Sequence, residues 1–285
     1  MTQSLIPGAK ILLMGEAGSG KTHSLRTLSD SRITPFILFT EPGMEVVSDI
    51  PCSKLHYHYI PPTTSDWNAL AGMAERVNQL NYENLMKMSD ANRSKYTQYI
   101  DVIKYNNNFI CDRCKQSFGD VQTWGTDRAL CVDSLTGLNK AVVKLHIGGR
   151  PVMQQQEWQV TQNMLMALLD AWTAGGTRCW FILTAHEAME RDEVSGTIKR
   201  MVSTLGRAIA PQIPNFFSDV IECVRVGDKF TWDTAGSNVA TKARNLPVAS
   251  NQAPSFRQIV ERWQVRGGIL ETTTPQETLK LIQPK

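Results

Sequence analysis

The sequence predicts an α/β protein with a mostly parallel sheet that is covered by helices on both faces. Short apolar runs of the kind found in buried strands recur along the chain. Segments with helical spacing lie between these runs, and such alternation is typical of parallel sheets. With 285 residues, of which 42% are hydrophobic, the chain can bury a large core without disulfide bonds.

The strands in the first half are predicted from their residue types and boundaries. Residues 11–14 form an apolar run between two glycines, and a glycine-rich turn then leads into a helix predicted over residues 21–28. Further buried strands are predicted at residues 36–39, 129–133, 180–183 and 220–224. Residues 55–60 alternate in the manner of a strand, with His56 and His58 on one face.

The second half adds a helix and a strand pair. Apolar residues recur at helical spacing over residues 153–173, which predicts an amphipathic helix. Residues 230–232 and 239–243 flank a turn at residues 236–238, and we expect these two segments to pair with each other as terminal strands.

Composition and charge exclude several classes of protein. The 19 glycines and 13 prolines are ordinary numbers, so the chain is neither collagenous nor wholly disordered. A net charge of +3 does not establish nucleic-acid binding, although a local basic patch would be enough for it. The sequence shows no signal-peptide pattern and no apolar run near about 18 residues, so we expect a cytoplasmic protein without membrane contact and with free thiols.

A glycine-rich motif follows the first predicted strand and opens the next helix. Glycines let successive backbone N–H groups point at phosphate oxygens, and the start of a helix adds partial positive charge. We therefore expect this loop to bind ATP, with Lys21 on the β- and γ-phosphates and the Thr22 hydroxyl on Mg²⁺. Eight residues fit the pattern G-x-x-x-x-G-K-[ST]: Gly15, Glu16, Ala17, Gly18, Ser19, Gly20, Lys21 and Thr22.

Three more polar residues follow predicted strands, at the edge where α/β sheets place their ligands. Asp133 ends an apolar strand and is the candidate acid that organises Mg²⁺. Glu41 is the candidate base that activates the attacking water, with a simple turn carboxylate as the alternative. His186 is a candidate sensor of the γ-phosphate, with a structural, hydrogen-bonded histidine as the alternative.

In this order along the chain, the motifs resemble the RecA-like P-loop ATPase core over most of residues 8–250. The resemblance implies that Glu41 is the catalytic base, that Asp133 is the acid associated with Mg²⁺, and that His186 senses the γ-phosphate. It also implies that Lys242 and Arg244 reach the ATP of a neighbouring subunit in a homo-oligomer, which would be a ring or a filament.

The resemblance further implies a flexible DNA-binding loop after the sensor, at about residues 187–206. The candidate DNA-binding residues there and just beyond are Arg191, Lys199, Arg200 and Arg207. In size and in its sequence around the sensor, the chain looks most like the compact RecA-like proteins of bacteriophages, which are AAA-domain ATPases of recombination or single-strand annealing.

The core is predicted to be interrupted. We expect residues 1–60 and 127–250 to form the ATPase core, residues 61–126 to form a helical or loop insertion, and residues 251–285 to form a C-terminal helix and tail.

The predicted insertion carries a pair of thiols, Cys111 and Cys114, in a C-x-x-C arrangement. A tetrahedral zinc site needs two further ligands, for which His56, His58 and Cys52 are candidates. Because no second C-x-x-C exists in the sequence, a redox pair or a degenerate knuckle is favoured over zinc.

The function predicted from these observations is a Mg²⁺-dependent ATPase that binds single-stranded DNA in phage recombination or replication. Two alternatives use the same core. One is a helicase or other motor subunit, and the other is a nucleotide-dependent scaffold that hydrolyses ATP poorly.

Overall fold

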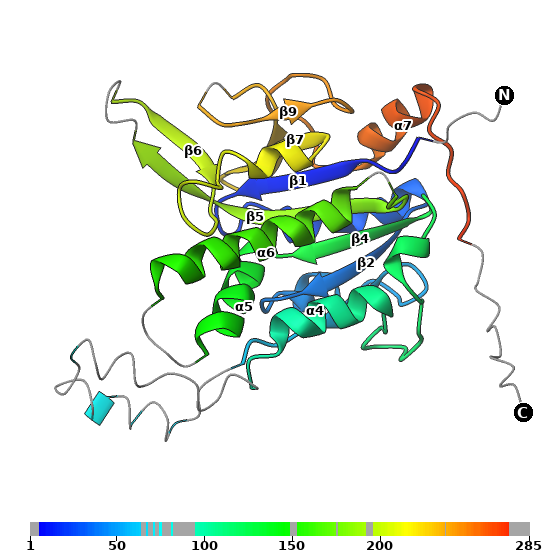
Figure 1. Ribbon diagram of the computed structural model, residues 1–285. Coiled ribbons are helices and arrows are strands. Elements are labelled where there is room, and N and C mark those ends of the chain that lie inside the picture. The colour runs from blue at the N-terminus through cyan, green and yellow to red at the C-terminus, as the bar shows by residue number, and fades with distance from the viewer. Residues whose placement is uncertain are drawn as a thin grey trace, which may run out of the picture.

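The computed structural model describes residues 6–63, 95–148, 153–174, 176–191, 196–236 and 238–273, with a few isolated positions between 64 and 94. In this part of the chain the strands form one sheet in the order β3-β2-β4-β5-β1-β7-β8 (Figure 1). The strands that run parallel to their neighbours are β1 (Lys10–Gly15), β2 (Thr34–Phe39), β3 (His56–Tyr59), β4 (Arg128–Asp133), β5 (Trp180–Arg191) and β7 (Asp219–Val226). The antiparallel additions are β6 (Ile198–Val202), β8 (Lys229–Asp233) and β9 (Lys242–Ala243).

Helices lie on both faces of this sheet, which confirms the predicted fold class. One face is covered by α4 (Gln98–Asn107), α5 (Leu135–Ile147) and α6 (Gln155–Thr173) (Figure 1). The other face packs against the 3-10 helices η1 (Leu25–Ser31) and η2 (Met44–Val47) and against α7 (Arg257–Val265). The remaining helical turns are α1 (Lys21–Ser24), η5 (Val121–Thr123) and η6 (Ile213–Phe216).

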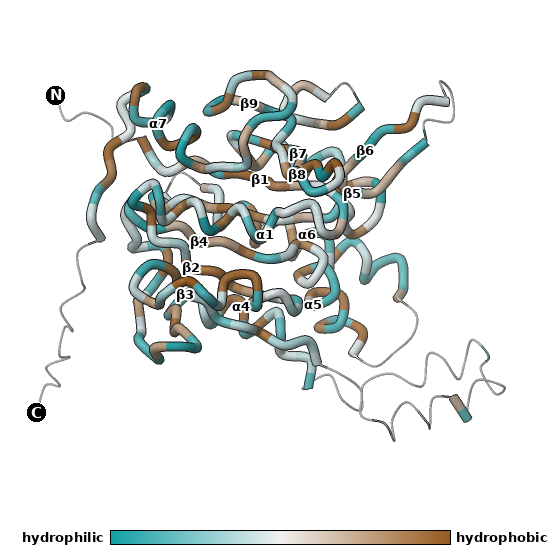
Figure 2. Tube along the Cα trace, turned by 180° about the vertical axis from the view of Figure 1, so that it is seen from behind, coloured by the Kyte–Doolittle hydropathy of each residue, from teal (hydrophilic) through white to brown (hydrophobic). Residues whose placement is uncertain are grey.

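Each central strand contributes alternate side chains to two separate cores. In β1, Leu12 lies in the core beneath α5 and α6, whereas Ile11 lies in the core that contains Trp263 of α7. The strands are therefore apolar on both sides, as Figure 2 shows by the hydrophobic colour along the centre of the sheet. No helix in the described residues is both long enough and apolar enough to span a bilayer.

The predicted pairing of residues 230–232 with 239–243 is wrong. Both segments pair with β7 instead, with Trp232 opposite Cys223 and Lys242 opposite Val220. Since β7 is the last parallel strand on its side, its outer edge would leave backbone groups unpaired, and β8 and β9 supply partners for them.

Helix α5 had no counterpart among the sequence-based predictions, although local signals for it exist. Ser134 precedes the helix, and its side chain accepts a hydrogen bond from the Gly137 N–H. Leu135, Leu138 and Val142 then recur at helical spacing and are buried.

The described part of the predicted insertion packs directly on the sheet. Tyr99 and Val102 of α4, together with Phe109 and Trp124, share one core with Leu130 of β4. Most of residues 64–94 lie outside the described part, so the insertion boundaries at 61 and 126 stay a prediction.

Candidate nucleotide-binding site

The glycine-rich loop crosses from the carboxyl end of β1 to the first residue of α1. Gly18 and Gly20 have positive φ angles of 74° and 85°, a region that glycine adopts without strain. A Cβ on Gly15 would lie 2.4 Å from the carbonyl oxygen of Cys223, and one on Gly20 would lie 2.9 Å from the Phe230 ring. The loop therefore needs glycine both for its curl and for its close approach to β7 and β8.

The Lys21 side chain turns back toward the loop and is bonded to its carbonyl groups. Its Nζ donates to the carbonyl oxygens of Gly15 at 2.8 Å and Glu16 at 2.7 Å. Burial lowers the pKa of Lys21, with nearby acids acting in the opposite direction. The ammonium is thus held by main-chain dipoles at the position from which it can move to a phosphate.

Asp133, at the end of β4, accepts two hydroxyl hydrogen bonds. Thr22 donates to its Oδ2 at 2.6 Å, and Thr184 of β5 donates to its Oδ1 at 2.5 Å. Burial raises the pKa of Asp133, and the two hydrogen bonds oppose that rise. A hydroxyl and a carboxylate in contact are the hard oxygen donors that Mg²⁺ prefers beside nucleotide phosphates, so this pair fits a magnesium site.

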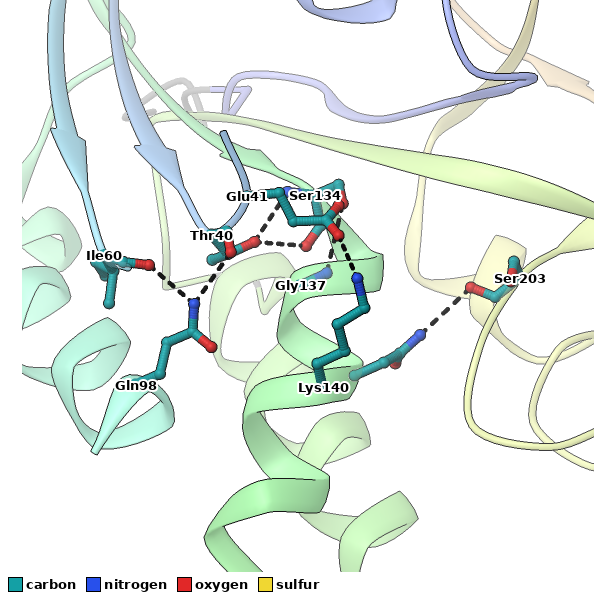
Figure 3. Close-up of polar contacts among 9 residues, drawn as sticks. Thr40, Glu41, Ile60, Gln98, Ser134, Gly137, Lys140 and Ser203 are labelled. Atoms are coloured by element: carbon teal, nitrogen blue, oxygen red, sulfur yellow. Dashed lines mark hydrogen bonds and ion pairs between the residues drawn. The ribbon is translucent and has the colours of Figure 1, made fainter. Parts of the chain in front are cut away.

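Glu41 follows β2 and is held by two residues from the start of α5 (Figure 3). Its Oε1 lies 2.8 Å from the Lys140 Nζ, and its Oε2 accepts a hydrogen bond from the Ser134 hydroxyl. Burial raises the pKa of Glu41, but the contacts with Lys140 and Ser134 outweigh this effect, so the pKa is lowered. Glu41 is consequently ionised near neutral pH, which is the form in which it can accept a proton.

The segment that carries Glu41 is fixed by a second set of hydrogen bonds. The Thr40 hydroxyl donates to the Ser134 carbonyl oxygen at 2.9 Å and accepts from the Ser134 N–H at 3.0 Å. Gln98 of α4 donates to the carbonyl oxygens of Thr40 at 3.0 Å and Ile60 at 2.8 Å (Figure 3). The ends of β2 and β3 are thereby tied to α4 and α5.

His186 lies in β5 directly opposite Gly15. Burial, followed by the charge of Lys21, lowers its pKa, so the ring is neutral near neutral pH. A cleft of about 430 Å³ opens here, and the predicted site residues that line it are Ala17, Gly18, Ser19, Gly20, Lys21, Thr22, Glu41, Asp133 and His186. The sheet brings them together because its parallel strands end at the same edge.

The segment predicted as a flexible DNA-binding loop, residues 187–206, is a β-hairpin in its described part. Glu187–Arg191 of β5 pairs antiparallel with β6, so that Ala188 lies opposite Met201. The parallel neighbour β1 ends at Gly15, opposite His186, so β5 needs a new partner to continue as a strand. The hairpin projects beyond the edge of the sheet (Figure 1).

Arg200 and Arg207, both predicted to bind DNA, are each engaged in an ion pair. Arg200 pairs with Glu222, a carboxylate whose side chain is only 3% exposed, and the Arg207 Nε lies 3.3 Å from the Glu190 carboxylate. Beside the hairpin is a pocket of about 640 Å³, whose lining includes Arg191, Lys199, Arg200 and Arg207.

The two predicted inter-subunit residues lie away from the loop of their own chain. Lys242 in β9 donates to the Phe217 carbonyl oxygen at 2.7 Å. Arg244 has an exposed side chain, and its backbone N–H donates to Asp219 at 2.8 Å. Since β9 pairs with the first residues of β7, both residues lie toward the amino ends of the parallel strands.

Of the three candidates for further zinc ligands, two lie beside the predicted thiol pair. Cys52 and His56 lie with Cys111 and Cys114 in one cluster. His58 does not join it, because its Nδ1 faces the Asp112 carboxylate at 2.8 Å.

Sequence reasoning missed three residues that hold the site together: Ser134, Lys140 and Thr184. Thr184 had a signal, because it is a polar residue in an otherwise apolar strand beside the predicted sensor. Lys140 had none without helix α5, which carries it to Glu41. Ser134 follows Asp133 directly, and it reaches Glu41 because β4 pairs with β2.

Comparison with known proteins gives a family and two structural resemblances. Residues 7–245 match the family model for an AAA domain. None of the curated proteins matches the chain. Among solved structures, a prototypical ATPase from the type III secretion system of pathogenic bacteria aligns at 17% identity and a TM-score of 0.40, over 77% of this chain and 53% of that one. The flagellar accessory protein FlaH from Methanocaldococcus jannaschii aligns at 13% identity and a TM-score of 0.29, over 80% of this chain and 77% of that one. The chain thus spans about half the length of the first of these structures.

Proposed function

The chain belongs to the AAA domain family, and from this premise we propose that it is a Mg²⁺-dependent ATPase whose turnover is coupled to single-stranded DNA. One observation carries the proposal of hydrolysis. A phosphate loop, an oxygen pair suited to Mg²⁺, an ionised carboxylate and a neutral histidine line one cleft of about 430 Å³. The loop, the oxygen pair and the carboxylate are the parts that phosphoryl transfer to water requires, and the histidine is placed to contact the γ-phosphate.

In this proposal Lys21 leaves the loop carbonyls and pairs with the β- and γ-phosphates, while the loop N–H groups bind phosphate oxygens. Thr22 and Asp133 would hold Mg²⁺, which neutralises phosphate charge when bound. Water attacks the γ-phosphorus, the bond to the β–γ bridging oxygen breaks, and Glu41 accepts the proton from the water. The products are ADP and phosphate, and His186 loses its hydrogen-bond partner when phosphate leaves.

Strand β5 supports the proposed coupling, because it runs from the site into the hairpin without a break. The His186 carbonyl oxygen accepts from the Ser203 N–H at 2.8 Å, just after β6. Ser203 in turn accepts from Asn139 of α5 at 3.4 Å. A movement of His186 on phosphate release would thus be transmitted to the hairpin, where we place the contact of Arg191 and Lys199 with DNA phosphates.

We also propose assembly into a ring or filament in which Arg244 reaches the ATP of a neighbour. The exposed side chain of Arg244 supports this role. Lys242 is the weaker candidate, since its Nζ is held by a carbonyl oxygen of its own chain. We assign such an assembly to phage recombination or replication because the motifs resemble those of the compact RecA-like proteins of bacteriophages.

The decisive experiment measures ATP turnover during titration with single-stranded DNA, with particle mass recorded alongside. We expect DNA to stimulate turnover and the double variant Arg191→Ala/Lys199→Ala to lose most of that stimulation. Arg262→Ala on α7 is the matched control, because it removes an exposed cation away from the hairpin. Absence of DNA binding in the unmodified protein would refute the coupling, and absence of turnover would refute the ATPase assignment.

One feature favours a second candidate, a nucleotide-dependent scaffold with slow hydrolysis. The carboxylate of Glu41 is already occupied by Lys140 and Ser134, so it must exchange these contacts before it can take a proton. Tight ATP binding with turnover that stays slow at saturating DNA would identify the scaffold. A helicase would instead separate duplex strands, which an annealing protein does not do.

A further inference from the structure

Away from the cleft, four side chains from two chain segments turn toward one another. They are Cys52, in the turn before β3, His56, the first residue of β3, and Cys111 and Cys114, in the loop that follows α4. Their ligand atoms all lie within 4.8 Å of one another. We propose that this cluster is a structural zinc site with three thiolate ligands and one imidazole ligand, a site that is independent of the proposed ATPase activity.

Three of the six distances between ligand atoms match those of a tetrahedral zinc site, and all six are within 4.8 Å. Zn–S bonds of about 2.3 Å and Zn–N bonds of about 2.0 Å separate two sulfurs by about 3.8 Å, and a sulfur and a nitrogen by about 3.5 Å. Cys52 and Cys111 have their sulfurs 3.6 Å apart. The Nδ1 of His56 lies 3.4 Å from the Cys52 sulfur and 3.7 Å from the Cys114 sulfur.

The same distances argue against a disulfide in this place. A disulfide joins its sulfurs at about 2.05 Å, whereas Cys52 and Cys111 are 3.6 Å apart and all six cysteines are free. Three thiolates and an imidazole form one of the common ligand sets of structural zinc. Soft sulfur ligands also disfavour Mg²⁺ and Ca²⁺ at this cluster.

The backbone around the C-x-x-C pair is shaped as a metal-binding turn. Cys111 donates its N–H to the Gln116 carbonyl oxygen at 3.1 Å and accepts from the Lys115 N–H at 2.9 Å. Lys115 has a positive φ of 59°, which reverses the chain directly after the second thiol.

Contacts outside the four ligands hold the two segments in position. The Arg113 guanidinium donates to the carbonyl oxygens of Ile50 and Leu55, which flank Cys52. The His56 ring stacks on Phe36 with centroids 4.9 Å apart, so its orientation is fixed by packing. Cys114 is exposed, which provides a path by which the metal can enter.

The location of the cluster indicates a structural role. His56 lies opposite Phe36, five residues before Glu41, and five strand residues span roughly 16 Å. The cluster therefore lies toward the amino ends of the strands, on the outermost parallel strand, whereas the cleft lies at their carboxyl ends. With four protein ligands the site has no open position for substrate. Zinc would fasten the loop after α4 to the edge of the sheet.

The test is metal analysis of the full-length protein, purified under reducing conditions from zinc-supplemented medium. We expect one zinc per chain, and X-ray absorption should show three sulfurs and one nitrogen around it. Cys111→Ser and Cys52→Ser should lower the zinc affinity by more than about 100-fold, beyond the loss typical of outer contacts. Cys223→Ala is the control, because this buried cysteine lies in β7, on the far side of β1 from β3.

Several results would overturn the proposal. Reduced, unmodified protein that neither contains zinc nor takes it up would do so, as would a disulfide within the cluster under reducing conditions. Zinc that is retained equally in both serine variants would place the metal elsewhere. The measurements on the unmodified protein decide the question even if a serine variant fails to fold.

Discussion

The two ends of the parallel strands carry two different kinds of polar cluster. At the carboxyl ends, one continuous loop supplies most of the polar groups of the nucleotide cleft, and Glu41 after β2, Asp133 of β4 and His186 of β5 add to it. Toward the amino ends, beside β3, four ligand atoms come in equal numbers from two segments that lie more than fifty residues apart. The first cluster surrounds an open cleft, whereas in the second the ligand atoms face one another and only Cys114 among the four ligands is exposed.

The nucleotide cleft is suited to bind and release a substrate, whereas the thiol cluster is suited to hold two chain segments together. In the cleft, Lys21 and Glu41 are held by contacts that a substrate can replace, namely loop carbonyls and a surface lysine. In the thiol cluster the side chains face one another, which leaves a single small ion as the fitting occupant.

Removing the loop ammonium should have the largest effect. For Lys21→Ala we expect turnover to fall by about 10³-fold or more, the size of effect that one transition-state cation has in phosphoryl transfer. Steady-state ATPase assays and nucleotide binding by calorimetry measure it, and a thermal melt confirms folding. Near-normal turnover in a folded variant would show that this cleft is not the site of hydrolysis.

Replacing the candidate base should separate binding from chemistry. For Glu41→Gln we expect turnover to fall by about 10²-fold, while ATP still binds, because the amide keeps the shape but cannot take a proton. Comparing the ATP dissociation constant with the turnover number measures the split. Unchanged turnover would assign the base to another residue, whereas loss of ATP binding would assign Glu41 a structural role.

The ion pair at Glu41 should set the pH dependence. Lys140 lowers the pKa of Glu41, so Lys140→Met should raise that pKa. Because the base acts when ionised, the acidic limb of the turnover profile should move to higher pH, with a several-fold loss on that limb. Lys144→Met, one turn further along α5, is the control and should leave the limb in place. A limb that stays in place in both variants would show that a group other than Glu41 controls it.

The smallest effect is expected on ATP binding when the thiol cluster is disrupted, which tests whether this cluster and the nucleotide cleft are energetically independent. In Cys111→Ser we expect the free energy of ATP binding to change by less than about 0.5 kcal/mol, because sites farther apart than about 10 Å are nearly additive. The same variant should lower the melting temperature by about 5 °C or more if a metal fastens this edge. A large loss of ATP affinity would show that the two clusters are coupled.

The tertiary structure corrected the sequence-based expectations wherever an edge of the sheet needed a partner. Residues 230–232 and 239–243 both pair with β7, and residues 187–191 pair with β6 in place of a flexible loop. Local patterns indicate that a segment is a strand, but the choice of neighbour depends on which backbone groups the rest of the sheet leaves unpaired.

The parallel sheet and the phosphate loop could be predicted from local sequence, because buried strands and the G-x-x-x-x-G-K-[ST] pattern depend on residues that are close together in the chain. Local sequence also indicated Asp133, Glu41 and His186, since strand ends in a parallel sheet converge at one edge. Tertiary packing, in contrast, pairs Lys140 with Glu41 and brings Cys52 and His56, rather than His58, to the C-x-x-C pair. Those contacts depend on how helix α5 and the loop after α4 pack against the sheet, and no local pattern records such packing.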